Sequence, residues 1–446
     1  MKAILNFKQK WIGKQVQRLA SLVNLDGFEH CLRLSLVLGV WCLSLGSPAL
    51  AAIENPRSLD KPKADPLLPS LTLNRPLSPL ERRLIEETIV QFNQDAQQLL
   101  ETSQTDQAFD LWFRILNLQR RLGRSQEITG LGNIGEQAWK AGRRIELEAI
   151  TDRLHRLETD LRKSPQQTLS PDGKALGLAY QQVRDLNAAQ TFYQFQLQLA
   201  EQQQDSTAMV EILTELITVQ WGALNYALAT DYTQQKLTLL RSGPVTLESL
   251  QEERSLLNSL AFLAQQIGDY PTQISALEET IALTLDLGLV EEVPALWADL
   301  GNAYRANNQF NLAVQSYYQG YAFAQENQQY EAAQRILASL GQLQEAEGEL
   351  QDAIQTYELL RQVHRYSSNL LGLLDSYDRL GQLYLQIQQP EQAQEQFEQG
   401  LTLARRLKYR ESEFEVYLQQ FEEVEEVEEI EKREAVQEEV EDHANF

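Results

Sequence analysis

Cysteine and histidine are scarce in this chain of 446 residues, and their scarcity excludes several kinds of site. Both cysteines, Cys31 and Cys42, lie close to the N-terminus, so the rest of the chain can form neither a disulfide nor a metal site built on thiolates. The four histidines stand singly, without a second histidine three or four residues away. Zinc motifs need such pairs. We therefore expect no bound metal and no cofactor.

The sequence motifs of common enzyme classes are also missing. We find no G-x-S-x-G, no P-loop and no H-E-x-x-H. Residues 130–135, "GLGNIG", fit the glycine pattern of a dinucleotide-binding loop. No β-branched run precedes them, and crossing helices require the same small residues. We predict that the protein is not an enzyme and that His155 and His364 are exposed surface residues.

Basic residues are too few to balance the acidic ones. The chain has 39 Lys and Arg against 63 Asp and Glu, which gives a formal net charge of -24. Nucleic acids reward clustered Lys and Arg, so we predict no nucleic-acid partner and favour a basic protein or peptide. The acidic residues of 423–446 lack the alternating ligands and turn glycine of a calcium loop, so we interpret this segment as a solvated acidic tail.

The longest apolar run near the N-terminus is too short for a membrane span. Residues 34–46, "LSLVLGVWCLSLG", carry no charge, whereas a transmembrane helix needs about 20 residues. Basic residues precede the run, and "SPALAA" follows it, with Ala49 and Ala51 at the positions of a cleavage site. This pattern predicts a signal peptide over 1–52 and export to a periplasm, a thylakoid lumen or the extracellular space. The alternative is an uncleaved leader that anchors the protein to a membrane.

Prolines are concentrated directly after this leader. Residues 53–80 contain six of them, which fix the backbone and remove hydrogen-bond donors, so we predict a Pro-rich extended linker over 53–78. The linker ends where Ser78 can cap a helix. Pro79 suits the first helical turn, and Glu81 stands where the reciprocal capping bond forms.

A 40-residue repeat is the strongest pattern in the sequence. Leu-Gly pairs recur, an alanine follows each glycine after 12 residues, and an aromatic residue follows four residues later. The three copies contain Gly301, Ala313 and Tyr317; Gly341, Ala353 and Tyr357; and Gly381, Ala393 and Phe397. Each copy reads as a helical hairpin with an apolar face that it cannot bury alone. We predict that Gly301 and Ala313 face each other where the two helices cross most closely.

One copy matches a known family throughout. The matching residues are Trp297, Leu300, Gly301, Tyr304, Ala313, Tyr317 and Gly320. They resemble the tetratricopeptide repeat, in its long variant of about 40 residues rather than the usual 34.

Weaker copies extend this pattern upstream. We predict an all-α protein, a right-handed α-solenoid of about eight antiparallel helical hairpins over 79–408. Phe414, Tyr417, Leu418 and Phe421 recur at helical spacing, which predicts a capping helix at 409–422 that covers the last apolar face.

The resemblance implies that the first helix of each hairpin contacts ligands on the concave side of the solenoid. By alignment, these positions are Asn258, Phe262, Gln265, Asn302, Arg305, Gln342, Asp378, Gln382 and Leu385. Amides there could bond an extended peptide, with Phe262 and Leu385 as apolar anchors. A merely solvated helix surface in a glutamine-rich chain would show the same residues.

The predicted function is therefore an exported, non-enzymatic scaffold that binds protein or peptide partners and aids assembly of a larger complex. Glutamine-rich repeats, a body without cysteine and an export leader are similar to cyanobacterial repeat proteins of the periplasm or thylakoid lumen, some of which assist assembly of membrane complexes. Two alternatives remain. One is a membrane-tethered adaptor that keeps its leader, and the other is a helical-array enzyme that uses surface carboxylates on a glycan or lipid precursor.

Overall fold

The computed structural model describes residues 59, 63–69 and 75–421. The leader predicted at 1–52 and the acidic tail predicted at 423–446 lie outside the described residues, as does much of the predicted linker. The chain divides into two units, Met1–Lys61 and Pro62–Phe446, and all described helices lie in the second.

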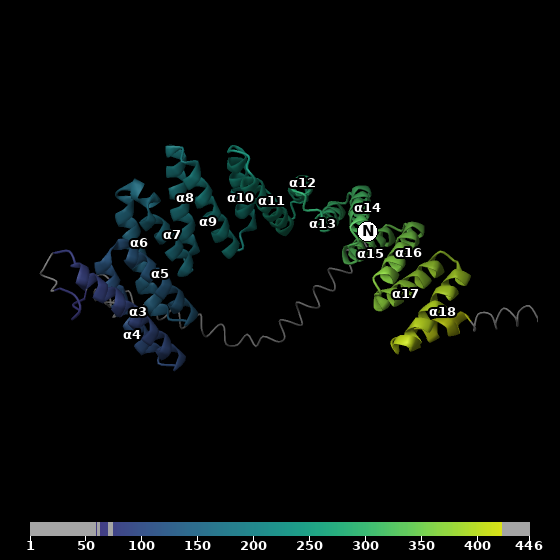
Figure 1. Ribbon diagram of the computed structural model, residues 1–446, viewed down its shortest axis with the longest axis horizontal. Coiled ribbons are helices and arrows are strands. Elements are labelled where there is room, and N and C mark those ends of the chain that lie inside the picture. Colours follow the sequence, from purple (N-terminus) through teal and green to yellow (C-terminus); the bar gives the residue numbers. More distant parts are fainter. Residues whose placement is uncertain (1–58, 60–62, 70–74, 422–446) are drawn as a thin grey trace, which may run out of the picture. The chain divides into compact units, whose positions relative to one another are not determined.

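The described helices follow one another as eight consecutive packed pairs, without any strand among the described residues (Figure 1). In chain order they are α3 (Pro79–Glu101) with α4 (Thr105–Leu122), α5 (Arg124–Lys140) with α6 (Arg144–Arg162), α7 (Pro171–Gln182) with α8 (Leu186–Gln203), α9 (Ser206–Gly222) with α10 (Tyr226–Arg241), α11 (Leu247–Ile267) with α12 (Tyr270–Asp286), α13 (Val293–Ala306) with α14 (Phe310–Glu326), α15 (Tyr330–Ala346) with α16 (Leu350–Tyr366), and α17 (Leu370–Gln386) with α18 (Pro390–Leu407). A 3-10 helix, η2 (Pro165–Leu169), precedes α7. The predicted all-α solenoid of helical hairpins is confirmed. In the part of the chain that the structure describes, no helix combines the length and apolarity that a membrane crossing requires.

The first helix begins at the predicted capping box. The backbone N–H of Glu81 donates to the Ser78 hydroxyl at 3.3 Å, and the Glu81 carboxylate accepts from the Ser78 N–H at 2.7 Å. Arg75 also donates to Glu81, and this bond lowers the pKa of the Glu81 carboxyl to about 2. The start of α3 is therefore set by side chains that satisfy its free backbone donors.

Residues 63–69, which belong to the predicted linker, are held against α4. The Asp65 carboxylate accepts two bonds from Arg114, at 2.6 and 3.2 Å. The Asn117 amide accepts from the backbone N–H of Lys63 at 3.0 Å and donates to its carbonyl at 2.8 Å. The middle of the predicted linker is thus attached to the first hairpin.

We define the crossing position of each hairpin as the residue eight positions before the N-cap of its second helix. The residues at this crossing position are Ala96, Gly135, Gly177, Ile217, Ala261, Gly301, Gly341 and Gly381. A Cβ added to Gly301 would come within 2.7 Å of the Tyr317 ring, and one added to Gly381 within 2.4 Å of the Phe397 ring. The nearest neighbour of Gly301 is therefore Tyr317 and not Ala313, because the long aromatic side chain reaches across the space that the missing Cβ leaves.

The glycines of residues 130–135 lie inside α5 and not in a loop. A Cβ on Gly132 would come within 3.0 Å of the Ala179 Cα in α7, and one on Gly135 within 2.3 Å of the Val183 side chain. These glycines allow two neighbouring first helices to approach closely. The dinucleotide interpretation has no geometric basis here.

Helical residues continue from 411 to 421 and cover the apolar end of the last hairpin. Phe414 is fully buried. The ring of Tyr417 stacks on that of Phe397, with centroids 4.5 Å apart and planes 28° apart. This packing confirms the predicted capping helix and its apolar residues.

Candidate partner-binding site

The nine predicted contact residues lie on four first helices. They are Asn258, Phe262 and Gln265 on α11; Asn302 and Arg305 on α13; Gln342 on α15; and Asp378, Gln382 and Leu385 on α17. We call the exposed surface of the first helices the first-helix face. Six of the nine residues are exposed there, and the other three, Asn302, Asp378 and Gln382, are half-buried.

These three half-buried residues already have internal partners. The Asn302 side-chain oxygen accepts from the Tyr317 hydroxyl at 2.7 Å. Asp378 forms an ion pair with Arg410 at 2.5 Å and accepts from the Gln382 amide at 2.7 Å. Because Arg410 directly precedes the capping helix, this part of the first-helix face is used to attach the end of the solenoid.

The predicted anchor Phe262 belongs to an aromatic pair. Its side chain is 44% exposed, and its ring stacks on Trp221 of α9 with centroids 5.2 Å and planes 17° apart. Trp221 lies four residues after Ile217, the place that Gln265 and Arg305 occupy in their own repeats. Trp221 was not predicted as a contact residue, because the fourth repeat has Ile217 instead of a glycine or alanine at its crossing position.

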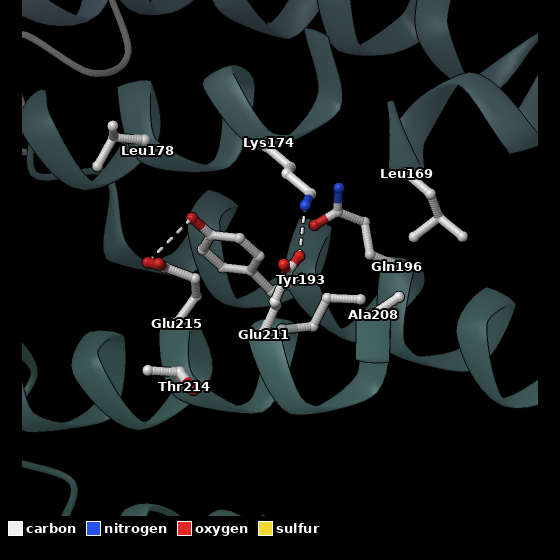
Figure 2. A pocket seen from close by; sticks show the side chains of 10 residues that line it. Leu169, Lys174, Leu178, Tyr193, Gln196, Ala208, Glu211, Thr214 and Glu215 are labelled. Atoms are coloured by element: carbon white, nitrogen blue, oxygen red, sulfur yellow. Dashed lines mark hydrogen bonds and ion pairs between the residues drawn. The ribbon is translucent and has the colours of Figure 1, made fainter. Parts of the chain in front are cut away.

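A cavity of about 430 Å³ lies on the first-helix face between α7 and α9, and α8 and η2 complete its wall (Figure 2). Lys174 and Leu178 line it from α7. They stand three residues before and one residue after Gly177, the offsets that Asn258 and Phe262 have from their own crossing position. Alignment alone could have found these two residues, but the transfer of contact positions stopped at α11.

Glu215 of α9 is bonded to neutral groups inside this cavity. The Gln181 amide donates to Glu215 at 2.7 Å and to the Tyr193 hydroxyl at 2.9 Å, and that hydroxyl reaches Glu215 at 3.5 Å. Burial raises the pKa of the Tyr193 phenol, so it stays a neutral donor. Among the described residues we find no ion pair that neutralises Glu215. Its neighbour Glu211, by contrast, is paired with Lys174.

Gln196 adds another acceptor to the cavity wall. Its side chain is only 2% exposed, and its amide nitrogen donates to the carbonyl of Thr168. A carbonyl can only accept, so the nitrogen must point toward Thr168 and the oxygen toward the cavity, as Figure 2 shows. The polar lining of the cavity therefore combines three groups that accept, the Gln196 oxygen and the carboxylates of Glu211 and Glu215, with the Lys174 ammonium and the hydroxyls of Tyr193 and Thr214.

Other cavities differ in lining or position. One of about 260 Å³ between α3, α4 and α5 is lined largely by amides, and the Gln119 side-chain oxygen is buried near it without a partner. Another, of about 420 Å³, is lined mostly by the hairpin turns around residues 308–314 and 347–349. Only the α7–α9 cavity among these combines an exposed apolar side chain of a first helix with charged acceptors.

The histidines differ from expectation at one position. His364 is only 8% exposed and lies beside Asn369 at 3.2 Å, so the prediction of a surface histidine was wrong. Its ring occupies the space above Gly372, where a Cβ would come within 2.4 Å of it. Burial lowers the pKa of the His364 imidazole. In the described ranges, no three His, Cys, Asp or Glu side chains gather as a metal site would require.

Comparison with known proteins identifies one repeat by its sequence. Residues 374–406, from the middle of α17 to the end of α18, match the family model described as "Tetratricopeptide repeat". A search of curated proteins gives no match.

Several solved structures resemble the chain at low identity. BtubC from P. vanneervenii is 14% identical with a TM-score of 0.33, over 50% of this chain and 92% of that one. The apo form of RapI is 10% identical with a TM-score of 0.36, over 72% and 98%. A signal transduction ATPase from Pyrococcus horikoshii with a tetratricopeptide repeat sensor is 14% identical with a TM-score of 0.36, over 71% and 54%.

At these values the structural likeness carries no functional inference. The sequence match assigns a tetratricopeptide repeat to residues 374–406, which lie on one of the eight consecutive helical hairpins.

Proposed function

We propose that the protein is a non-enzymatic adaptor that binds protein or peptide partners on its first-helix face, with the α7–α9 cavity as the main contact. The observation that carries this proposal is the cavity itself, which places the half-exposed Leu178 next to Glu215 and the Gln196 oxygen. Recognition sites of this kind combine an apolar surface with a few fixed polar groups. An extended segment can place alternate side chains into such a groove.

The cavity does not favour the enzyme alternative. Hydrolysis of a glycan by an acid–base pair requires two carboxyl groups that are free to act on one bond. Here Glu211 forms an exposed ion pair with Lys174 that a ligand could displace, whereas Glu215 accepts from Gln181 and Tyr193 and is not free to act as the second group. The cavity is also open to solvent along α7, where Leu178 is 50% exposed. These contacts suit the binding of a polar segment better than chemistry in a closed site.

We further propose that the adaptor acts after export. The support is the leader pattern at 1–52, with its basic start, short apolar run and cleavage-like "SPALAA". N-terminal sequencing of the protein from its own cells tests this proposal. A mature start near Ile53 is the expected result. A start at Met1 would contradict it and support the membrane-tethered adaptor.

Crosslinking in the cells that make the protein, followed by mass spectrometry, tests the binding proposal. We expect Leu178→Gln to reduce capture of the partners by at least about fivefold, because it removes apolar surface from the groove. The control is Leu371→Gln, which changes a leucine that is 57% exposed at the start of α17, away from this cavity. Equal capture by both variants would refute the cavity as the main contact.

The same experiment examines the residues that the sequence predicted. Triple replacement of Asn302, Arg305 and Gln342 by Ala tests the first-helix face on α13 and α15. If this variant loses partners and Leu178→Gln does not, the binding surface lies nearer the C-terminus.

A further inference from the structure

We infer that the α7–α9 cavity recognises a lysine or arginine side chain of an extended partner peptide. This inference rests on the proposed function, because it names the group that the proposed contact would receive. The cavity lies on the first-helix face, as do the predicted contact residues of α15 and α17. Its charged residues, however, have different hydrogen-bond and ion-pair partners from the charged residues of those two helices.

The first support is the donor and acceptor balance of the cavity wall. Three acceptors face it: the carboxylates of Glu211 and Glu215 and the oxygen of Gln196. A cationic side chain brings several N–H donors and no acceptor, so it is complementary to this wall. A carboxylate ligand would find Lys174 as its main cation and would face repulsion from both glutamates.

The second support is that Glu215 accepts hydrogen bonds only from neutral donors among the described residues. Gln181 and Tyr193 each bring a hydrogen bond to it, but no basic side chain of the described chain pairs with it. A hydrogen bond with one ionised partner is about twice as strong as one between neutral groups, and a cationic donor adds the attraction between opposite charges. A partner ammonium or guanidinium would therefore add a contact that the chain does not make for itself.

The third support is the apolar approach to these acceptors. Leu178 is half exposed at the cavity edge, and Ile212 lies in the wall. Lysine and arginine carry apolar stems that cover such surfaces while the charged head stays near polar groups. A stem lying on Leu178 can direct its head toward Glu215.

Lys174 shows that the cavity accepts an ammonium group. Its side chain enters the cavity and pairs with Glu211, as Figure 2 shows. Both partners of this ion pair are more than half exposed, and exposed pairs contribute little stability. Lys174 is therefore a replaceable competitor for the incoming cation.

Titration of the purified protein with a blocked peptide, acetyl-Ala-Ala-Lys-Ala-Ala-amide, tests the inference by ligand-observed NMR. We expect the lysine peptide and its arginine version to bind, and the norleucine version to bind about tenfold more weakly, since norleucine keeps the stem but lacks the charge. Equal affinities of the lysine and norleucine peptides, or no lysine binding up to about 10 mM, would overturn the inference.

Variants give opposite expected shifts. Glu215→Gln should weaken lysine-peptide binding about fivefold and leave the norleucine peptide unchanged, whereas Lys174→Gln should strengthen lysine binding about threefold. The matched control is Glu201→Gln, which removes the same charge from an exposed site at the end of α8. An unchanged lysine affinity in Glu215→Gln would overturn the inference, and an equal reduction in Glu201→Gln would show that only net charge attracts the peptide.

Two further measurements distinguish this inference from alternative explanations. Spermidine is titrated alone, and binding as tight as that of the lysine peptide would assign the cavity to a free amine instead of a partner side chain. In the crosslinking experiment, loss of partners in Leu178→Gln without loss in Glu215→Gln would refute the cation pocket and leave the adaptor function standing.

Discussion

In two parts of the first-helix face, residues at the same repeat positions form different surfaces. One surface is closed by ion pairs, and the other keeps a carboxylate without an ion pair among the described residues. In the region of α7 to α9, the residue four after the crossing glycine is Gln181, and it meets Glu215 and the Tyr193 hydroxyl. In the region of α15 to α17, the equivalent residue is Glu345, which forms an ion pair with Arg379 beside the Tyr357 hydroxyl.

The difference between the two regions is whether the protein itself supplies a positive charge next to the acidic residue. Arg379 neutralises Glu345 within the protein, and Asp378 beside it is neutralised by Arg410. Between α7 and α9 the amide of Gln181 takes the place of a charged group, and Glu215 remains an uncompensated acceptor at an open cavity. The same backbone therefore presents a closed, self-paired surface in one region and a surface for an external cation in the other.

The largest expected effect tests what the two regions share. Gly177→Ala and Gly381→Ala should each lower the free energy of unfolding by about 2 kcal/mol, because the new Cβ would come within 2.5 Å of the Tyr193 and Phe397 rings respectively. Urea denaturation measures this. Gly222→Ala is the control, since its Cβ would meet its nearest atom at an ordinary 3.7 Å; a loss of the same size there would contradict the steric explanation.

A charge transplant tests what separates the regions. The double variant Gln181→Glu with Glu215→Arg copies the Glu345–Arg379 pair into the α7–α9 cavity. We expect it to reduce binding of the blocked lysine peptide by about tenfold, or about 1.4 kcal/mol, because the protein then supplies its own cation. Glu345→Gln with Arg379→Gln is the control that should leave binding at α7–α9 unchanged, and an equal loss there would place the peptide elsewhere.

A smaller effect concerns the capping helix, which only the α15–α17 region adjoins. Arg410 pairs with Asp375, Asp378 and Glu413, so Arg410→Ala removes three ion pairs at once. We expect faster hydrogen exchange over 411–421 and a loss of about 1 kcal/mol in stability. Arg405→Ala, which breaks one exposed pair with Glu415, should change exchange much less. Similar hydrogen exchange over 411–421 in both variants would show that Arg410 does not attach the capping helix to the last hairpin.

The smallest expected effect is a pH dependence confined to the α15–α17 region. Burial lowers the pKa of His364 below its usual 6.5, so the folded state favours the neutral ring. As pH falls through 6.5, the unfolded chain gains a proton that the folded chain resists, and this contribution to stability is lost. His364→Gln should therefore show a smaller drop in urea midpoint between pH 7.5 and 5.5 than the wild type. An identical drop in urea midpoint in the variant and the wild type would contradict this role of His364.

The fold was largely predictable because its determinants recur at local spacing. The 40-residue period, Gly301 with Tyr317 and the turn between them all lie within one hairpin, where helical periodicity relates sequence distance to spatial distance. The capping residues Phe414 and Tyr417 were predictable for the same reason. The side chain closest to Gly301, that of Tyr317, was harder to predict because residue type alone does not say how far a ring reaches.

The candidate site was predictable only in part. The nine predicted contact residues lie on first helices and six of them are exposed, but they come only from α11 to α17, where the repeat is clearest, and three of them have internal partners. The α7–α9 cavity and the pairing of Phe262 with Trp221 depend on neighbouring hairpins. No match of residue types within one repeat indicates which side chains of the next hairpin they will meet.

The sequence by itself determined that this protein is built from helical hairpins, where each pair of helices crosses and how its last face is covered, because small and aromatic residues at fixed spacing leave one way to bury each apolar stripe. Only the tertiary structure decided which charged side chains form ion pairs within the protein. Glu345 and Arg379, like Gln181 and Glu215, are 34 residues apart and meet only once adjacent hairpins have packed. Whether a first helix presents an open acceptor or a closed ion pair is therefore settled between repeats and not within them.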